Sequence, residues 1–322
     1  MRRAQVLTIV LVGLLQLVVI VTLALAGPEE DPHAAPIRVV APAVVGAFVV
    51  ERANSLQGRP VEAEALSTPA EARDSVRGGR SVAAIVVDLR QETDRVYVAS
   101  ANGTRLNQMV LAQITAIESS YGRSIAVTDL VPVRSGDADH WHAYVLAGTC
   151  VVVGLGVAVL ITWRRGPHAE TLTGGSWRLA ASAAAAVVVG GVLAVLAAAY
   201  YDTGIAAWWL VMALTILAGA TTTLALESLL GVPGIGVATT VLVLSAAPMV
   251  TLAHPLLLPE PWATLTQWLP HGAGRDAATS IAYFGGGQIV RPVLVLVVWS
   301  VISVVTTAVA RRERARHLAV NP

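Results

Sequence analysis

An acidic residue inside a long apolar stretch is the first feature of the sequence that indicates chemistry. Thr215, Gly219, Thr223 and Glu227 follow one another at intervals of four residues, so they share one face of a predicted helix. Acids within membrane helices usually face the bundle interior and mark a pathway, which makes this face a candidate substrate path. The alternative is that Glu227 lies in water at the inner membrane interface, because it is within about one turn of the helix end.

A second polar group falls in an apolar segment at 254–292 that prolines and the triplet Gly285–Gly287 interrupt. No unbroken apolar run of about 20 residues fits inside it, so it should not cross a bilayer as one helix. We expect two short helices, Trp262–Leu269 and Gly274–Phe284, within a re-entrant outer hairpin at 258–289.

The break of this hairpin carries candidates for an outer gate, which are Trp268, His271, Arg275 and Asp276. The alternative is that Arg275 and Asp276 form the solvated face of a short helix that begins with an ordinary acid. The sequence does not decide between the two interpretations.

Two further motifs are weighed and set aside. Asp137, Asp139, His140 and His142 could bind a metal, but ligands at alternate positions need a fixed strand geometry, so a polar linker is favoured. The glycines of Gly231–Gly236 are not followed by GK[ST], and no Walker A pattern occurs, so the chain has no P-loop for ATP hydrolysis. No nucleophile–base set is present, and we expect no enzyme, metal or cofactor.

The composition divides the chain into two parts. Of its 322 residues 55% are hydrophobic and only 13% charged, against about 25% charged in soluble domains. Roughly fifteen of the 21 acidic residues lie between Glu29 and Asp139, which predicts a polar domain at 31–140 and a membrane part after it. The net charge of +1 gives no case for nucleic acid as a partner.

The apolar runs predict a polytopic α-helical membrane protein with six transmembrane helices. The spans are Ala4–Ala26, Tyr144–Trp163, Leu179–Tyr200, Trp208–Leu230, Val237–Leu257 and Val290–Ala310. Arginines next to the spans place both termini in the cytoplasm, in a multi-pass protein of the cell membrane whose partner is the lipid bilayer. Residues 1–30 then form the first helix, although Ala24–Ala26 also fits a signal-peptidase site; residues 141–311 form a five-helix domain, and 312–322 a cytoplasmic tail.

The exported part predicts an inserted extracytoplasmic α/β domain. Five strands are expected at Ile37–Val40, Val61–Leu66, Val82–Val87, Asp94–Ala99 and Ile125–Asp129. Helices are expected at Val44–Leu56, from Thr68 to Gly78, and at Thr104–Tyr121, the second with a capping box that Thr68 and Glu71 form. Strands that alternate with helices indicate a mixed sheet with helices packed on it.

Two stretches of the membrane part are expected to make contacts. Small residues form a stripe for helix packing, within the chain or in a dimer, at Ser182, Ala186, Gly190, Ala194 and Ala198. The inner loop from Arg164 to Arg178 is the longest charged inner connection, and its candidates for docking an ATPase are Arg164, Arg165, His168, Glu170 and Arg178. Alternatively, its arginines only set the topology and meet anionic lipid head groups.

The order of one span, a large exported domain and five spans resembles the ABC-2 type permease superfamily. Within it, the phrases ARDSVRGGRSVAAIVV (Ala72–Val87) and WLPHGAGRDAATSIAYFGGGQIVRP (Trp268–Pro292) are similar to the YhgE/Pip-like (phage infection protein-like) membrane proteins. The resemblance implies the membrane subunit of an exporter for an amphipathic or envelope-related molecule. It also implies a homo- or heterodimer with a separate ATPase subunit. The alternative is a non-transporting envelope protein whose exported domain binds a partner.

Overall fold

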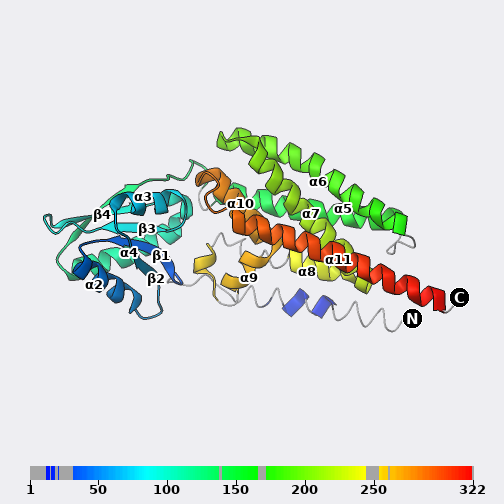
Figure 1. Ribbon diagram of the computed structural model, residues 1–322, viewed down its shortest axis with the longest axis horizontal. Helices are drawn as coiled ribbons and strands as arrows, with labels where there is room; N and C mark the ends of the chain where they lie inside the picture. The colour runs from blue at the N-terminus through cyan, green and yellow to red at the C-terminus, as the bar shows by residue number, and fades with distance from the viewer. Residues whose placement is uncertain are drawn as a thin grey trace.

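The computed structural model describes residues 12–14, 16–18, 21, 32–137, 140–165, 172–243, 254–259 and 262–320. An α/β domain forms one end of the molecule, and long helices run away from it along the longest axis (Figure 1). Two short helices, α9 (Trp262–Trp268) and α10 (Pro270–Tyr283), lie where the two parts meet.

The α/β domain contains a five-stranded mixed sheet in the order β2-β1-β3-β4-β5. Its strands are β1 (Ala35–Val40), β2 (Val61–Ala65), β3 (Ala83–Val86), β4 (Thr93–Val98) and β5 (Ser124–Asp129). β1 pairs in parallel with β2 and β3, and β4 pairs in parallel with β5, whereas β3 and β4 are antiparallel. The predicted mixed sheet is therefore confirmed.

Helices cover this sheet where their apolar faces can be buried. They are α2 (Ala43–Asn54), α3 (Pro69–Arg77), the 3-10 turn η1 (Ser100–Asn102) and α4 (Thr104–Ser120). The Thr68 hydroxyl accepts from the Glu71 amide and the Glu71 carboxylate accepts from the Thr68 amide, so the predicted capping box starts α3. Leu106 and Ile114 of α4 are fully buried against the sheet.

Four described helices are long and apolar enough to cross a membrane. They are α5 (Trp141–Arg165), α6 (Leu172–Tyr201), α7 (Ile205–Leu230) and α11 (Val290–Val320), and they match four of the six predicted spans. α7 is the central helix, because 67% of its apolar window is buried, compared with 22% for α6. It packs against α5, α6 and α11.

The remaining two predicted spans are not confirmed. Most of Ala4–Ala26 lies outside the described residues. Of Val237–Leu257, the start belongs to the short helix α8 (Pro233–Leu242), residues 244–253 are outside the described part, and the end is the 3-10 turn η4 (Pro255–Leu257). Leu257 is buried with the core of the α/β domain, so the predicted end of that span was wrong.

Two helix ends also differ from their predictions. The first helix ends before Pro270 as predicted, but Pro270 also opens α10 as a first-turn residue, so α10 begins before the predicted Gly274. Proline fits there because its missing amide would have no partner in the first turn. α11 continues to Val320, so most of the predicted tail at 312–322 is helical.

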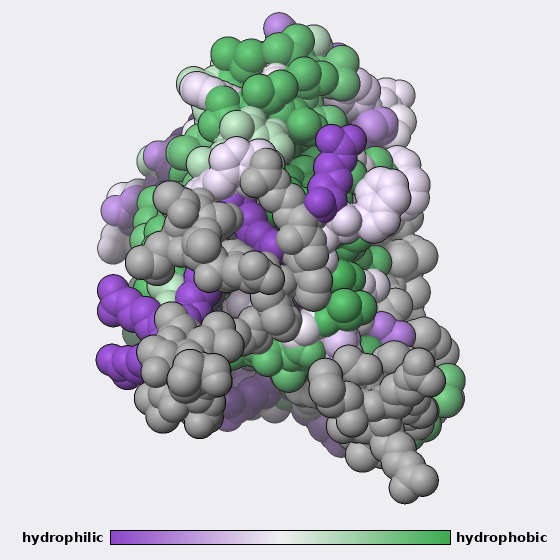
Figure 2. Space-filling model, turned by 90° about the vertical axis from the view of Figure 1, so that its right-hand side faces the viewer, coloured by the Kyte–Doolittle hydropathy of each residue, from purple (hydrophilic) through white to green (hydrophobic). Residues whose placement is uncertain are grey.

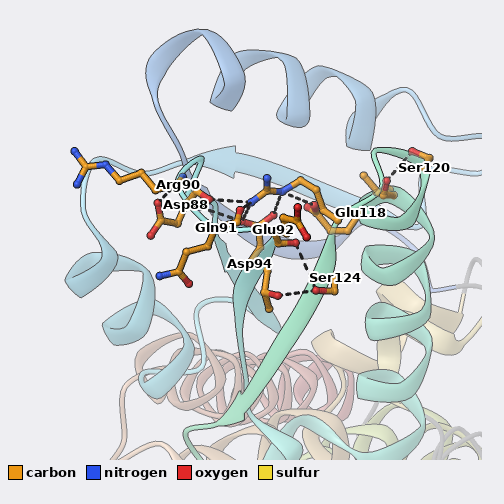
Figure 3. Close-up of polar contacts among 11 residues, drawn as sticks. Asp88, Arg90, Gln91, Glu92, Asp94, Glu118, Ser120 and Ser124 are labelled. Carbon is orange, nitrogen blue, oxygen red and sulfur yellow. Dashed lines mark hydrogen bonds and ion pairs between the residues drawn. The ribbon is translucent and has the colours of Figure 1, made fainter.

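A buried ionic cluster joins the edge of the sheet formed by β4 and β5 to the end of α4 (Figure 3). Arg123 donates from Nε to Asp94 Oδ2 at 2.5 Å and from a terminal nitrogen to the Gln91 carbonyl at 2.8 Å. The Asp94 side chain is fully buried, and Glu118 lies beside it. Burial, followed by a hydrogen bond with Asp94, raises the pKa of Glu118 to about 7. Burial also raises the pKa of Asp94, but its hydrogen bonds, that from Arg123 first, outweigh this and lower it.

This cluster predicts a loss of stability as the pH rises from 5 to 8. The pKa of Glu118 is raised from 4.5 to about 7, so the folded state binds the extra proton; this stabilisation is complete below pH 4.5 and is lost as the pH passes 7. Glu118→Gln should flatten the decrease of the unfolding free energy with pH, which for one group is at most about 1.4 kcal/mol per pH unit. Hydrogen exchange of β4 and α4 in the full chain, corrected for intrinsic rates, measures it. A variant with the parent's slope would contradict the assignment.

Candidate functional site: a polar pocket between the α/β domain and the helices

An aromatic side chain from the helical part completes the core of the α/β domain. Phe284 follows α10 and is 9% exposed, and it packs with Ala72 and Val76 of α3 and with Tyr97 of β4. Gly79 lies beneath it with a φ of +68°, and a Cβ there would be 3.0 Å from the Phe284 ring. Glycine is therefore required both by the backbone and by the approach of the ring.

A second contact joins the two parts on the other face of the sheet. Leu257 and Leu258, together with Ala263 of α9, belong to the apolar cluster that contains Ile37 and Ile85. The His33 amide donates to the Leu256 carbonyl at 2.8 Å, which ties the entry to β1 to the same segment. The hairpin segment is thus attached to the domain on two sides.

Asp137 connects the end of the α/β domain to three helices. Its carboxylate accepts hydrogen bonds from Tyr201 of α6 at 2.7 Å, from His142 of α5 at 2.8 Å and from Tyr283 of α10. Burial alone would raise the pKa of Asp137, but the hydrogen bonds from Tyr283, His142 and Tyr201 outweigh it and hold the pKa below its ordinary value. Asp137 therefore remains a charged acceptor. Of the tyrosines around it, Tyr201 stacks on Trp208 and meets Tyr283 edge to face.

A pocket of about 150 Å³ lies between these contacts. The domain side contributes Asn102, Gly103 and Arg105, and the helical side contributes Tyr144 of α5, His254, and Arg275 and Thr279 of α10. Phe284 and Gln288, which follow α10, also line it. Because both parts of the molecule supply its walls, anything that fills the pocket touches both.

Arg275 is the central charged group of the pocket. Its side chain is 5% exposed, and it donates from Nε to Asp276 at 2.8 Å and from a terminal nitrogen to the Tyr144 hydroxyl at 3.0 Å. The guanidinium also lies 5.2 Å from the centre of the Tyr144 ring. The predicted gate residues Arg275 and Asp276, which are neighbours in the sequence, both line the pocket, and Arg275 faces it rather than solvent.

The pocket can accommodate a small polar or anionic group. Its volume of about 150 Å³ is roughly ten times the ~10–15 Å³ that one water molecule needs. Two arginines, Arg105 and Arg275, line it against one carboxylate, Asp276. The Asn102 amide nitrogen and the Thr279 hydroxyl are buried without a hydrogen-bond partner among the described residues, so both are available to a ligand.

The other two predicted gate residues lie outside the pocket. His271 is 1% exposed, and neither ring nitrogen has a hydrogen-bond partner within the described part of the chain. Trp268 is 54% exposed, and its carbonyl accepts from the Trp299 indole at 2.7 Å. The hairpin break therefore separates the four candidates: two meet at the pocket, one is in the interior, and one is on the surface.

The predicted substrate-path face of α7 is filled by neighbouring helices. Thr215 and Thr223 donate to carbonyls one turn earlier in α7, and a Cβ on Gly274 of α10 would be 3.0 Å from Thr215. Gly219 meets α5, where a Cβ on Gly154 would be 2.3 Å from the Ile216 carbonyl oxygen. In this conformation the face is a packing surface.

Glu227 lies at the junction of three helices. It is 1% exposed, the Thr162 hydroxyl of α5 donates to it, and Arg178 of α6 lies 3.8 Å away. Arg178 was predicted to be part of an inner docking loop. Instead it lies within α6, which begins at Leu172, and the Arg178 side chain is only 5% exposed. The physical reason is the charge of Glu227, which a buried cation can compensate.

The remaining contact predictions concern α6 and the inner loop. The stripe Ser182–Ala198 lies against α7, where a Cβ on Gly190 would be 2.8 Å from the Ala213 amide nitrogen, so the small residues serve packing within the chain. Arg164 is exposed at the end of α5, whereas His168, Glu170 and the Arg165 side chain are outside the described part.

Several pocket residues were not identified from the sequence. Asn102 and Thr279 are ordinary polar residues at a helix start and in a helix, and nothing in their spacing connects them. Asp137, which lies near the pocket, was expected to belong to a polar linker or, less favoured, to a metal site, yet its oxygens are occupied by the hydrogen bonds described above. A usable signal was the pair of phrases Ala72–Val87 and Trp268–Pro292, since Gly78 of the first lies against Gly287 of the second, and Gly79 lies against Phe284.

Comparison with protein-family models, with curated proteins and with solved structures finds no match to this chain.

Proposed function

We propose that the chain is the membrane subunit of an ABC-2-type exporter that moves an amphipathic or envelope-related molecule. In this proposal the pocket between the α/β domain and the helices receives the polar part of that molecule on the outer side. ATP is hydrolysed by a separate subunit, in keeping with the absence of a Walker A pattern from the sequence. The subunit works as a homo- or heterodimer.

The observation that carries the proposal is that the pocket has walls from both parts of the molecule. A ligand that contacts Arg105 on one side and Arg275 on the other changes the free energy of the domain's position relative to the helices. A passive anchor would require no such shared pocket. The orphan polar atoms of Asn102 and Thr279 support a ligand there.

The charge distribution supports an orientation with both termini in the cytoplasm. On the side of the molecule away from the α/β domain, hydrophilic residues lie among hydrophobic ones (Figure 2). Arg164 at the end of α5 and Arg312 and Arg316 in α11 are exposed. The positive-inside rule assigns that end to the cytoplasm, which leaves the α/β domain and the hairpin outside.

Affinity purification of the full chain from its native membranes tests the proposal. We expect a P-loop ATPase to co-purify and to hydrolyse ATP. Replacing residues 166–171 by a Gly/Ser linker of equal length keeps Arg164, Arg165 and Arg178, so insertion should be unchanged while the ATPase is lost. The swap stops before α6, so it spares the helix. An ATPase that is absent from the parent, or retained by the swap, contradicts the proposal.

A second candidate function is a non-transporting envelope protein whose exported domain binds a partner. The filled face at Thr215, Gly219 and Thr223 favours it, because those residues form helix contacts in this conformation. For this candidate, Asn102→Ala with Thr279→Val should weaken binding of an envelope partner, and no ATPase should be recovered.

A further inference from the structure

A second cavity of about 460 Å³ lies along α11, at the end of that helix nearer to the α/β domain. It is a groove lined by residues of α11 and α9, and the Trp299 indole in its wall donates a hydrogen bond to the Trp268 carbonyl. Its walls are mostly apolar, and the side chains that matter here are Trp268, Arg291, Leu294, Val295, Val298 and Trp299. The size is within the range of small-molecule sites.

One cation stands at the mouth of this groove. Arg291 is exposed, and its guanidinium lies 5.2 Å from the centre of the Trp268 ring. Within the described ranges no carboxylate lies at ion-pair distance from Arg291. Stacking on an aromatic ring leaves the edge of a guanidinium free to donate hydrogen bonds to an anion.

We propose that the groove binds an anionic phospholipid, with an acyl chain along Leu294 and Val298 and the phosphate at Arg291. The groove has a cation at one end and an apolar wall along the rest, so it complements a lipid with an anionic head group and an apolar chain. Guanidinium groups bind phosphate oxygens in a bidentate way, and tryptophans such as Trp268 are enriched at the membrane interface. The proposal depends on the placement of α11 across a membrane, which is part of the proposed function, but not on export.

Native mass spectrometry of the full chain in detergent, with phosphatidylglycerol or phosphatidylcholine added, tests the site. We expect phosphatidylglycerol to bind roughly tenfold more tightly, because both lipids offer a phosphate to Arg291 but only phosphatidylcholine also carries a cation, which Arg291 repels. Arg291→Gln should remove this preference. Leu294→Trp fills the groove and should weaken both lipids. Inorganic phosphate should not displace bound lipid, because it lacks the acyl chain.

Matched controls separate the groove from general lipid contact. Arg164→Gln removes an exposed arginine at the other end of the helices, and Leu196→Trp enlarges a side chain on α6 that is 60% exposed; neither should change lipid binding. Equal binding of the two lipids, an unchanged Arg291→Gln variant, or displacement by inorganic phosphate would overturn the proposal. A Leu294→Trp variant that still binds lipid but no longer forms a dimer would also overturn it, because the groove would then be a contact between two copies of the chain. None of these results affects the ATPase test, so the two proposals can fail separately.

Discussion

Replacing Glu227 by leucine is expected to lower the stability of the helical part by about 3–5 kcal/mol, the usual cost of breaking a buried ion pair. The carboxylate lies 3.8 Å from Arg178, and both side chains are at least 95% buried, with exposed fractions of 1% and 5%. Removing one charge leaves the other in an apolar environment. Thermal unfolding of the purified chain in detergent, followed through its tryptophans, measures the loss.

The double variant Arg178→Met with Glu227→Leu is the matched control. It removes both charges and keeps similar volumes, so it should recover most of the stability. Thr162→Val removes only one hydrogen bond to Glu227 and should cost about 1–3 kcal/mol. A double variant as unstable as Glu227→Leu would show that the pair does not act as a unit.

Phe284→Ala is expected to detach the α/β domain from the hairpin, at a cost of about 3–5 kcal/mol for an emptied aromatic site. The ring is 9% exposed and fills a gap between α3 and β4. Hydrogen exchange should increase at Val76 and Tyr97, on the domain side of the contact. Gly79→Val should act in the same way, because it combines a φ of +68° with a clash against the ring.

The other phenylalanine of the chain provides the control for this prediction. Phe48 belongs to α2 of the same domain and is 54% exposed, so Phe48→Ala should change exchange at Val76 and Tyr97 little. If Phe284→Ala behaves like Phe48→Ala, the ring is not what holds the two parts together.

The elements of the α/β domain could be predicted because their signals are local. Thr68, Pro69 and Glu71 mark a helix start by themselves, and the alternating strand at Asp94–Ala99 was found as β4. The four predicted spans that match helices long and apolar enough to cross a membrane are apolar runs bounded by turns or charges. Such patterns need no knowledge of the rest of the chain.

The candidate site was harder to predict because its contacts join residues far apart in the sequence. Asn102 and Thr279 meet only through the packing of the domain on α10. The burial of Arg178 in α6 depends on Glu227, which lies at the far end of the next helix, α7. Pro270 shows the local form of the problem: proline can end one helix or begin the next, and the sequence alone does not say which.

The central claim is that the α/β domain and the helices are held in one arrangement around a shared pocket. Double electron–electron resonance between spin labels at Leu89 and Ile205 tests it directly, since both positions are exposed, at 57% and 48%. Cys150 is buried and is replaced by alanine for the labelling. We predict one narrow distance distribution for the parent and a broad one for Phe284→Ala. A broad distribution in the parent would contradict the account.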